Sequence, residues 1–217
     1  MRDIAIYGAG GLGREVACLI RIINESLPAD EEKWNLIGFF DDGKAIGERN
    51  EYGEILGGME ILNKWSKKIS IAIAVGLPNH LKKISESITS PLIDFPNLIV
   101  PNVIFFDKDN MTIGKGNIIS LNCTVSCNVS IGNFNFFNGF ISIGHDAKIG
   151  NFNAVMPGVR ISGNVDIGDA NLIGMESVII QGKKIGNETV VGSNSVIVRN
   201  TKDGFTYVGN PAKAISF

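Results

Sequence analysis

Isoleucine or valine recurs at every sixth position through the second half of the chain. From Ile113 to Ile197, fourteen of the fifteen positions in this phase are Ile or Val, and Phe137 is the exception. Two residues after each of these positions Ile and Val are absent, a pattern that neither a strand period of two nor a helical period of about 3.6 produces. We interpret the repeat as a solenoid, in which each hexapeptide forms a short strand and a corner and one branched side chain points inward. A β-sandwich of short strands is the alternative, but it would not keep one phase over fifteen repeats.

The first third of the chain has a different pattern. Residues 3–7 form an apolar strand that leads into the glycine loop Gly8–Gly13, and a helical stretch follows at about residues 14–25. This is a GxGxxG motif between a strand and a helix, where the glycines permit a tight turn and the helix N-terminus favours an anionic phosphate. Further strands are predicted at residues 36–40 and 69–76, followed by a helix near residues 81–88.

Two acids, Asp41 and Asp42, follow the second predicted strand, as in enzymes that bind a ribose hydroxyl. Because the repeat begins near residue 100, only half of a dinucleotide fold fits before it. The sequence therefore favours a mononucleotide or a nucleotide sugar over NAD. The remaining alternative is that the glycine turn only packs the helix against the strand.

The overall composition excludes several classes of protein. The net charge is −2 without a long basic run, so we expect no binding to nucleic acid or to an anionic membrane. Apolar runs are short and we recognise no signal peptide, so a cytoplasmic protein is expected. Cys18, Cys123 and Cys127 have no metal-binding spacing and are expected to be reduced thiols.

Both halves together resemble the sugar O-/N-acyltransferases of the sialic acid O-acetyltransferase and bacillosamine-pathway UDP-amino-sugar N-acetyltransferase type. The resemblance covers essentially the whole chain and is carried by Ile6–Gly13, Gly38–Asp42, Ile143–Gly150 and Gly209–Lys213. In these hexapeptide-repeat enzymes three repeats form one triangular coil. The resemblance therefore implies an α/β Rossmann-like half-domain at residues 1–97, which binds a nucleotide sugar, followed by an all-β left-handed parallel β-helix of about five coils at residues 98–200. A C-terminal tail at residues 201–217 would pack near the CoA site.

The same resemblance implies a homotrimer with active sites between subunits, where acetyl-CoA lies in the groove between neighbouring prisms. It assigns two sets of binding residues. Those implied for the nucleotide sugar are Gly10, Gly11, Leu12, Gly13, Asp41, Asp42, Gly76 and Asn138. Those implied for acetyl-CoA are Asn153, Ala154, Gly163, Met175, Gly192, Ser193, Pro211 and Lys213. No metal is expected.

The catalytic residue is expected to be His145. An amine or hydroxyl that attacks a thioester must lose a proton, and imidazole is suited to accept it at neutral pH. His145 stands at a predicted outward-facing corner, and the family's catalytic histidine occupies this place in the motif. Asp146 is the candidate that orients the imidazole, although a solvated turn residue is the other interpretation. His80, the other histidine, is expected to be a surface residue.

Three positions depart from relatives. Some relatives carry a second histidine where this chain has Ala154, many carry histidine where it has Leu12, and His-Pro is common where it has Val100-Pro101. These differences leave the position of the acetyl group and the identity of the nucleotide sugar open.

The function expected from these features is transfer of an acetyl group from acetyl-CoA to the amino group of a nucleotide-linked amino sugar, of the UDP-4-amino-sugar type, for surface glycan synthesis. O-acetylation of sialic acid or another sugar hydroxyl is the enzymatic alternative. A non-catalytic trimeric scaffold or binding protein is the alternative of another class. A carbonic-anhydrase-like metal site is rejected, because two histidines per chain do not supply its three ligands.

Overall fold

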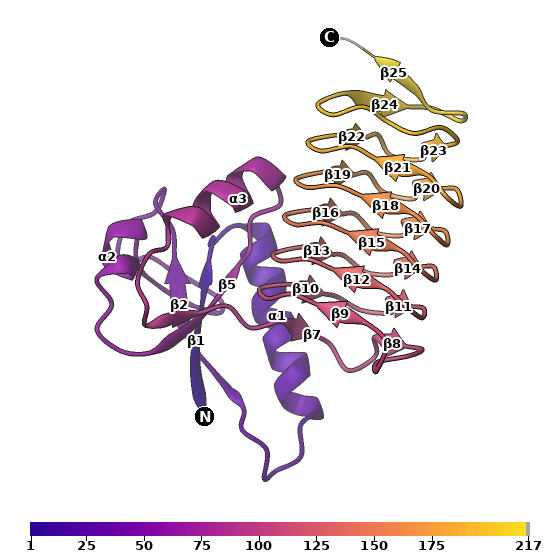
Figure 1. The fold of residues 1–217 in the computed structure, drawn as a ribbon. Helices are drawn as coiled ribbons and strands as arrows, with labels where there is room; N and C mark the ends of the chain where they lie inside the picture. The colour runs from indigo at the N-terminus through magenta and orange to yellow at the C-terminus, as the bar shows by residue number, and fades with distance from the viewer. Residues whose placement is uncertain (216–217) are drawn as a thin grey trace.

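The computed structural model describes residues 1–215, so Ser216 and Phe217 of the predicted tail lie outside the described residues. An α/β part is followed by a parallel β-solenoid (Figure 1). None of the helices in the described residues combines the length and apolar character that a membrane span requires.

The α/β part is a six-stranded sheet with the order β3–β4–β2–β1–β5–β6. All neighbouring strands are parallel except β3 and β4. The strands are β1 (Arg2–Tyr7), β2 (Trp34–Phe40), β3 (Arg49–Asn50), β4 (Gly53–Gly57), β5 (Ile69–Ile73) and β6 (Ile93–Asp94). The helices are α1 (Gly11–Ser26), α2 (Met59–Asn63) and α3 (Pro78–Ser87).

Side chains of β1 alternate between two cores, as expected for a strand that is buried on both faces. Ile4 and Ile6 pack with α1 and the solenoid, whereas Ala5 and Tyr7 pack with α2 and α3. Helix α1 therefore lies between the sheet and the solenoid (Figure 1). The predicted strands and helices of this region are confirmed, and the short elements β3, β4, α2 and β6 were not predicted.

The solenoid confirms the six-residue repeat. Strands eighteen residues apart pair in parallel, so that Ile131 lies on Ile149 and Ile149 lies on Ile167. The inward Ile and Val side chains of successive coils thus form stacks, and all of them from Ile119 to Ile197 are buried. Three strands complete one coil, and each hexapeptide supplies one strand and one corner.

Three faces form the prism. The first face contains β7 (Leu98–Ile99), β10 (Ile118–Ile119), β13 (Phe136–Phe137), β16 (Ala154–Val155), β19 (Leu172–Ile173), β22 (Val190–Val191), β24 (Thr206–Val208) and the antiparallel β25 (Lys213–Ile215). The second contains β8 (Ile104–Phe105), β11 (Thr124–Val125), β14 (Ser142–Ile143), β17 (Arg160–Ile161), β20 (Val178–Ile179) and β23 (Val196–Ile197). The third contains β9 (Thr112–Ile113), β12 (Ser130–Ile131), β15 (Lys148–Ile149), β18 (Asp166–Ile167) and β21 (Lys184–Ile185).

The prediction of about five coils is not confirmed, because the solenoid extends beyond the regular repeat. β7 and β8 precede Ile113 and pair with β10 and β11, and β24 adds a further strand to the first face. The strands before Ile113 carry no isoleucine or valine in the strict phase, which is why the repeat did not reveal them.

An asparagine ladder runs inside the edge between the third and first faces. The amide oxygen of Asn117 accepts hydrogen bonds from the backbone and side-chain nitrogens of Asn135, at 2.9 and 3.0 Å. Asn153 is bonded to Asn135 in the same way, and Asn171 to Asn153. All four side chains are buried. The ladder satisfies polar groups that would otherwise be unpaired in the core.

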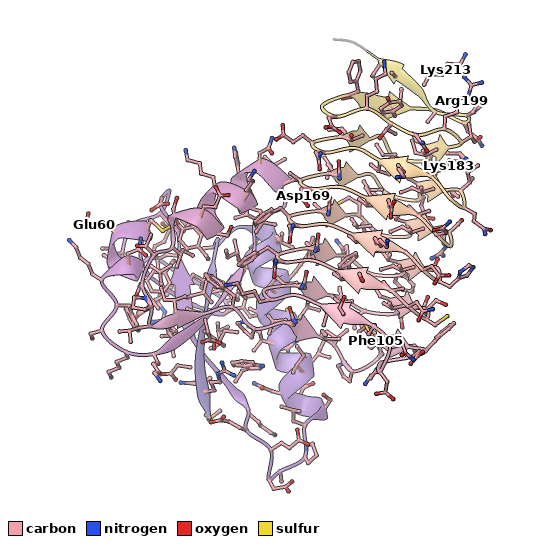
Figure 2. The ribbon with its side chains drawn as sticks, in the orientation of Figure 1. Glu60, Phe105, Asp169, Lys183, Arg199 and Lys213 are labelled. Atoms are coloured by element: carbon pink, nitrogen blue, oxygen red, sulfur yellow. The ribbon has the colours of Figure 1, made fainter. Side chains whose placement is uncertain are left out.

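The edge that carries this ladder faces the α/β part. Phe134 and Phe152 stack at this edge with ring centroids 5.7 Å apart, and Phe95 packs edge-on against Phe134. Figure 2 shows Asp169 on the side of the solenoid next to α3, and Arg199 and Lys213 on the opposite side. The two remaining edges are therefore away from α3.

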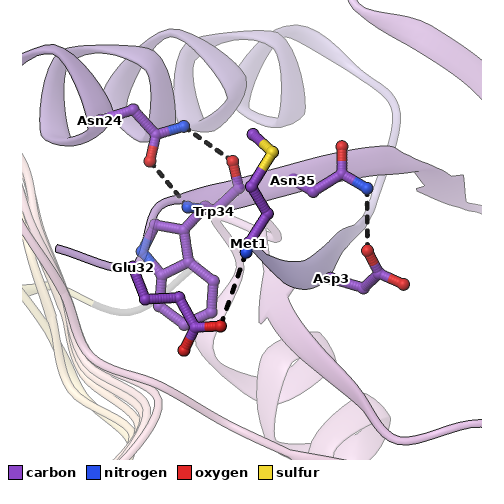
Figure 3. A network of polar contacts seen from close by, with 6 residues as sticks. All are labelled: Met1, Asp3, Asn24, Glu32, Trp34 and Asn35. Atoms are coloured by element: carbon purple, nitrogen blue, oxygen red, sulfur yellow. Dashed lines mark hydrogen bonds and ion pairs between the residues drawn. The ribbon is translucent and has the colours of Figure 1, made fainter. Parts of the chain in front are cut away.

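A polar network fixes the far end of α1 to the start of β2 (Figure 3). The side chain of Asn24 both accepts a hydrogen bond from the Trp34 backbone nitrogen and donates one to its carbonyl oxygen, each at 2.8 Å. Asn35 donates to Asp3 across the neighbouring strands at 2.8 Å. These contacts hold the sheet end that lies opposite the glycine loop.

Replacing Asn135 by leucine should lower the free energy of unfolding by about 2–4 kcal/mol, because the partners of its amide lose their hydrogen bonds in a buried position. Urea denaturation followed by circular dichroism would measure the loss. Lys148→Ala, on the exposed third face, is the control and should change little. Equal stability of both variants would contradict the structural role given to the ladder.

Candidate active site

His145 and Asp146 stand at the edge between the second and third faces, immediately after β14. His145 Nδ1 lies 2.7 Å from Asp146 Oδ2, and the two side chains are 52% and 50% exposed. Asp146 adopts φ of 58°, a left-handed conformation that aspartate and asparagine tolerate better than most residues. Asn128, one coil below, donates to the other carboxylate oxygen at 3.2 Å. The corner thus presents the imidazole outward, as the sequence predicts.

The hydrogen bond from His145 and then that from Asn128 lower the pKa of Asp146 below its ordinary value. The carboxylate is therefore ionised at neutral pH and favours the tautomer with the proton on Nδ1 of His145. In that tautomer Nε2 carries the free lone pair, which is the form a general base requires.

Gly163 lies directly above His145 in the next coil. A Cβ atom placed on Gly163 would stand 2.5 Å from Nε2 and 2.6 Å from Cε1 of His145. The imidazole therefore occupies the space that any side chain at residue 163 would fill. The sequence-based assignment of Gly163 to this site agrees with its position.

A backbone donor on this edge has no acceptor within residues 1–215. On the edge that carries the asparagine ladder, the N–H groups of Asn133 and Asn151 are each bound by an Asn or Asp side chain from the next coil. No group of the described residues accepts a hydrogen bond from the N–H of Gly163. This N–H group is free to bind an oxygen of a ligand.

The structure corrects the position of some residues predicted for acetyl-CoA. Met175, Gly192 and Ser193 follow β19 and β22, so they stand at the edge between the first and second faces. His145 is on the other edge of the second face. Within one chain they therefore stand on a different edge from His145, and the predicted shared groove would need two neighbouring chains.

Asn153 and Ala154 are also corrected. Both are fully buried, and the side chain of Asn153 is held in the asparagine ladder. Neither residue is accessible to acetyl-CoA in this chain. The position where some relatives carry a second histidine is therefore occupied by a small, buried apolar side chain.

The tail returns over the last coil. The Ala212 backbone nitrogen donates to Val196 of β23 at 2.9 Å, which places exposed Pro211 at the C-terminal end of the second face, while exposed Lys213 begins β25 on the first face. Asn138 follows β13 and is partly exposed; its side-chain oxygen accepts a hydrogen bond from Gly139 N–H at 2.8 Å. Asn138 is thus on the same edge as Met175, and no described contact links it to His145.

The glycine loop precedes α1 as predicted. Gly10 and Gly11 are exposed, and α1 has neither a side-chain cap nor an acidic residue in its first turn. Its N-terminus therefore offers unpaired N–H groups to an anion. Gly13 has a packing role, because a side chain there would collide with the carbonyl oxygen of Gly8. Leu12 lies partly exposed beside Gly76.

Asp41 and Asp42 fix the loops at the carboxyl ends of β1 and β2. Asp41 accepts hydrogen bonds from the backbone nitrogens of Ala9 and Gly43, at 2.8 and 2.9 Å. Asp42 accepts from the Tyr7 hydroxyl and from the Met59 backbone nitrogen. Burial and the hydrogen bond to Asp42 raise the pKa of Tyr7, so its phenol keeps its proton.

A cavity of about 440 Å³ opens beside this pair, between the loops and α3. Its lining includes Asp41, Asp42, His80, Lys83 and Ser87. His80 is exposed as predicted, but its place in this cavity was not predicted. The place of His80 could have been inferred from the topology. Helix α3 begins after β5, which ends at the same edge of the sheet as β1 and β2.

A second, smaller cavity of about 250 Å³ lies on the α1 side of the loop and includes Gly10, Arg14, Lys44 and Arg49. Arg14 forms an ion pair with Glu51. Lys44 pairs with Glu48, and Arg49 with Glu54. No group of three metal-ligating side chains occurs within residues 1–215. The three cysteines are free thiols.

Comparison with known proteins agrees with this architecture. Residues 3–88 match the PglD N-terminal domain. The acetyltransferase domain of PglB from Neisseria gonorrhoeae FA1090, solved in complex with acetyl coenzyme A, is 28% identical, with a TM-score of 0.85 and 99% of both chains covered. WeeI from Acinetobacter baumannii AYE is 26% identical, with a TM-score of 0.83 over 99% of this chain and 100% of that one.

A mutant of perosamine N-acetyltransferase from Caulobacter crescentus, in complex with CoA and GDP-perosamine, has the same fold. Its TM-score is 0.86 at 19% identity, over 100% of this chain and 98% of that one. Comparison with curated protein sequences finds no match.

The fold, the six-residue repeat and the corner histidine are features that the hexapeptide-repeat class shares. The N-terminal match and these similar structures narrow the likeness to sugar acyltransferases of the hexapeptide-repeat type, which the chain resembles over 99% of its length.

Replacing His145 by alanine should raise the pKa of Asp146 toward its ordinary value, because the largest cause of the lowered pKa is removed. In the wild type, the contribution of Asp146 to stability is present above the unfolded-state pKa and is lost as pH falls through the lower folded-state pKa. Carbon NMR titration of the Asp146 carboxyl would measure both proteins. An unchanged titration would show that the hydrogen bond to His145 is not formed in solution.

Proposed function

We propose that this protein transfers an acetyl group from acetyl-CoA to the amino group of a nucleotide-linked amino sugar, of the UDP-4-amino-sugar type, for surface glycan synthesis. The observation that carries the proposal is the exposed His145–Asp146 pair, whose imidazole is seated against Gly163. It is supported by relatives with bound acetyl coenzyme A, or with CoA and GDP-perosamine.

In this proposal His145 is the general base. Nε2 accepts a proton from the sugar amine as the amine nitrogen bonds to the acetyl carbon. Asp146 holds Nδ1–H and stabilises the imidazolium that forms. The protonated imidazole then returns the proton to the thiolate released when the carbon–sulfur bond breaks. Acetyl-CoA supplies the activated acyl group.

Gly163 supplies the oxyanion donor. Its free N–H group would bind the thioester oxygen as negative charge develops there, and a preorganised donor of this kind is worth roughly 10²–10³-fold in turnover. The absence of a side chain at residue 163 makes room for the imidazole of His145.

The nucleotide sugar is assigned to residues 1–97. The N-terminus of α1 at Gly10 and Gly11 would bind the diphosphate. The 440 Å³ cavity beside Asp41 and Asp42 has room for a nucleoside. Each carboxylate oxygen of Asp41 and Asp42 already accepts one hydrogen bond and retains a lone pair for a ribose hydroxyl.

A complete site is assigned to two copies of the chain. His145 and Gly163 stand on one edge of the second face, and Met175, Gly192 and Ser193 on the other. A homotrimer in which edges of different kinds meet would place both sets, with Asn138, around one acetyl-CoA. Residues 98–200 then form the acyltransferase part, and residues 201–215 carry Pro211 and Lys213 to its CoA end.

The test is release of thiol from acetyl-CoA in the presence of UDP-, dTDP- and GDP-linked amino sugars or free sialic acid. His145→Ala should lower turnover by roughly 10²–10⁴-fold, because the general base is lost. Its affinity for CoA and its assembly should stay as in the wild type, since the side chain is half exposed and packs little.

The outcomes separate the candidate functions. Release with one nucleotide amino sugar that is lost in His145→Ala supports the proposal. Release only with sialic acid or another hydroxyl acceptor would overturn N-acetylation in favour of O-acetylation. Failure of the wild type to bind CoA would favour a scaffold protein.

Gly163→Ala tests the same geometry without removing the base. The added Cβ displaces the imidazole, so turnover should fall at least about tenfold. Ser162→Ala, one residue earlier, is the control and should be nearly as active as the wild type. Full activity of Gly163→Ala would show that the thioester is not bound against this glycine.

A further inference from the structure

Three phenylalanines adopt left-handed conformations at corners of the solenoid. Phe134, Phe140 and Phe152 have φ of 53°, 65° and 59°, values that disfavour a bulky side chain unless a contact compensates. Phe134 and Phe152 have such contacts, because their rings stack and Phe95 of the α/β part packs against Phe134. Phe140 is 58% exposed and stacks on no aromatic ring in the part of the chain that the structure describes. Two aromatic corners thus dock the solenoid onto another part of the protein, and the third lacks a comparable contact.

Phe140 is also the exception in its own column of corner residues. Strand register aligns it with Asn122 in the coil below and with Gly158, Glu176 and Asn194 in the coils above, all of which have positive φ. These residues are polar or glycine, as expected for an exposed corner. Since the residue directly above is Gly158, no side chain at that position covers the ring. Phe140 therefore presents an exposed aromatic ring on the edge between the first and second faces.

The backbone of this corner is held from two neighbouring coils. The N–H of Phe140 donates to the carbonyl oxygen of Leu121 at 2.9 Å. Arg160 of β17 donates from its guanidinium to the carbonyl oxygen of Phe140. The corner that carries the ring is thus preorganised, which reduces the entropy lost when a ligand binds against it.

The height of Phe140 along the solenoid matches that of His145. One coil of eighteen residues rises by about 4.8 Å, so the five residues from Phe140 to His145 correspond to about 1.3 Å. Cyclic symmetry keeps equivalent residues of all subunits at one height when the solenoids run along the axis. In the proposed homotrimer, where the two kinds of edge meet, Phe140 of one subunit therefore lies opposite His145 of its neighbour. Met175, thirty residues after His145, would stand about 8 Å higher, beside the arm of CoA.

We propose that Phe140 of one subunit packs against the pyranose ring of the nucleotide sugar that is bound at His145 of the neighbouring subunit. One face of a sugar ring consists of C–H bonds, whose positive polarisation suits the negative face of an aromatic ring. Phenylalanine has no hydrogen-bonding group, so it positions the sugar by shape and leaves the amine free to approach Nε2 of His145. The inference rests on the proposed function and adds a residue that the sequence analysis did not assign.

Steady-state kinetics with the nucleotide amino sugar that the wild type acetylates tests this role. Phe140→Ala should raise the KM for the nucleotide sugar about tenfold and leave the KM for acetyl-CoA unchanged, because only the sugar loses a contact. Alanine is tolerated at such a corner, since Ala170 has φ of 57°. Phe140→Tyr keeps the aromatic face and should retain most of the affinity. Phe205→Ala is the matched control, because Phe205 is 45% exposed beside β24 on the first face, and both KM values should match the wild type.

Mixed trimers test whether the ring acts across subunits. Chains with Phe140→Ala and chains with His145→Ala are co-expressed with different tags and purified through both. Each mixed trimer contains one site that combines intact His145 of the first chain with intact Phe140 of the second, so the wild-type KM for the sugar should return at that site. No such site would form if both residues acted within one chain, because no chain carries both.

A Phe140→Ala enzyme with the wild-type KM for the nucleotide sugar would overturn the inference. Equal increases in both KM values, or dissociation of the trimer in light scattering, would also overturn it, since they indicate only a structural contact between subunits. Mixed trimers without a site of wild-type KM would exclude action across subunits. In each case acetyl transfer by the wild type would leave the proposed function intact. A wild type that acetylates no nucleotide sugar would overturn the proposed function and the inference together.

Discussion

The stacking of one branched side chain on the next determines the rest of this structure. Because Ile131, Ile149 and Ile167 lie in register, every corner residue also lies directly above the residue eighteen positions earlier. The register of the core strands therefore also aligns the corner residues on the surface. The catalytic candidate His145 and the glycine that makes room for its ring share one column for this reason.

The three edges of the prism use this alignment differently. The edge toward the α/β part is closed by its asparagine ladder and by the Phe134–Phe152 stack, which satisfy its polar groups and bury its surface. On the edge with His145, the N–H of Gly163 has no acceptor among the described residues, and the imidazole packs against this glycine. In the proposed function, stability and ligand binding are therefore divided between different edges of the same coils.

Much of this was predictable from the sequence, because a six-residue period and a strand–glycine loop–helix motif are local patterns. The outward position of His145 follows from its place in the period, whereas its hydrogen bond to Asp146 was only one of two interpretations of that aspartate. The burial of Asn153 was not predicted, because its side chain points into the prism and joins the asparagine ladder, a contact between coils that the sequence analysis did not consider. The cavity at His80 could not be predicted from local patterns either, because it forms only when α3 folds back over the ends of β1 and β2. The extent of the solenoid was underestimated because its first strands, β7 and β8, depart from the strict repeat.

The asparagine ladder repeats from coil to coil, so the length of the solenoid depends on the number of its coils. Each coil has the same length in residues and the same rise, so insertion or deletion of one eighteen-residue unit would preserve every stack, corner and ladder bond. Such a change would move the two ends of the second–third edge apart, or together, by about 4.8 Å without disturbing the chemistry at either end. In solenoids of this kind, the distance between two surface sites on one edge can thus change only in steps of one coil.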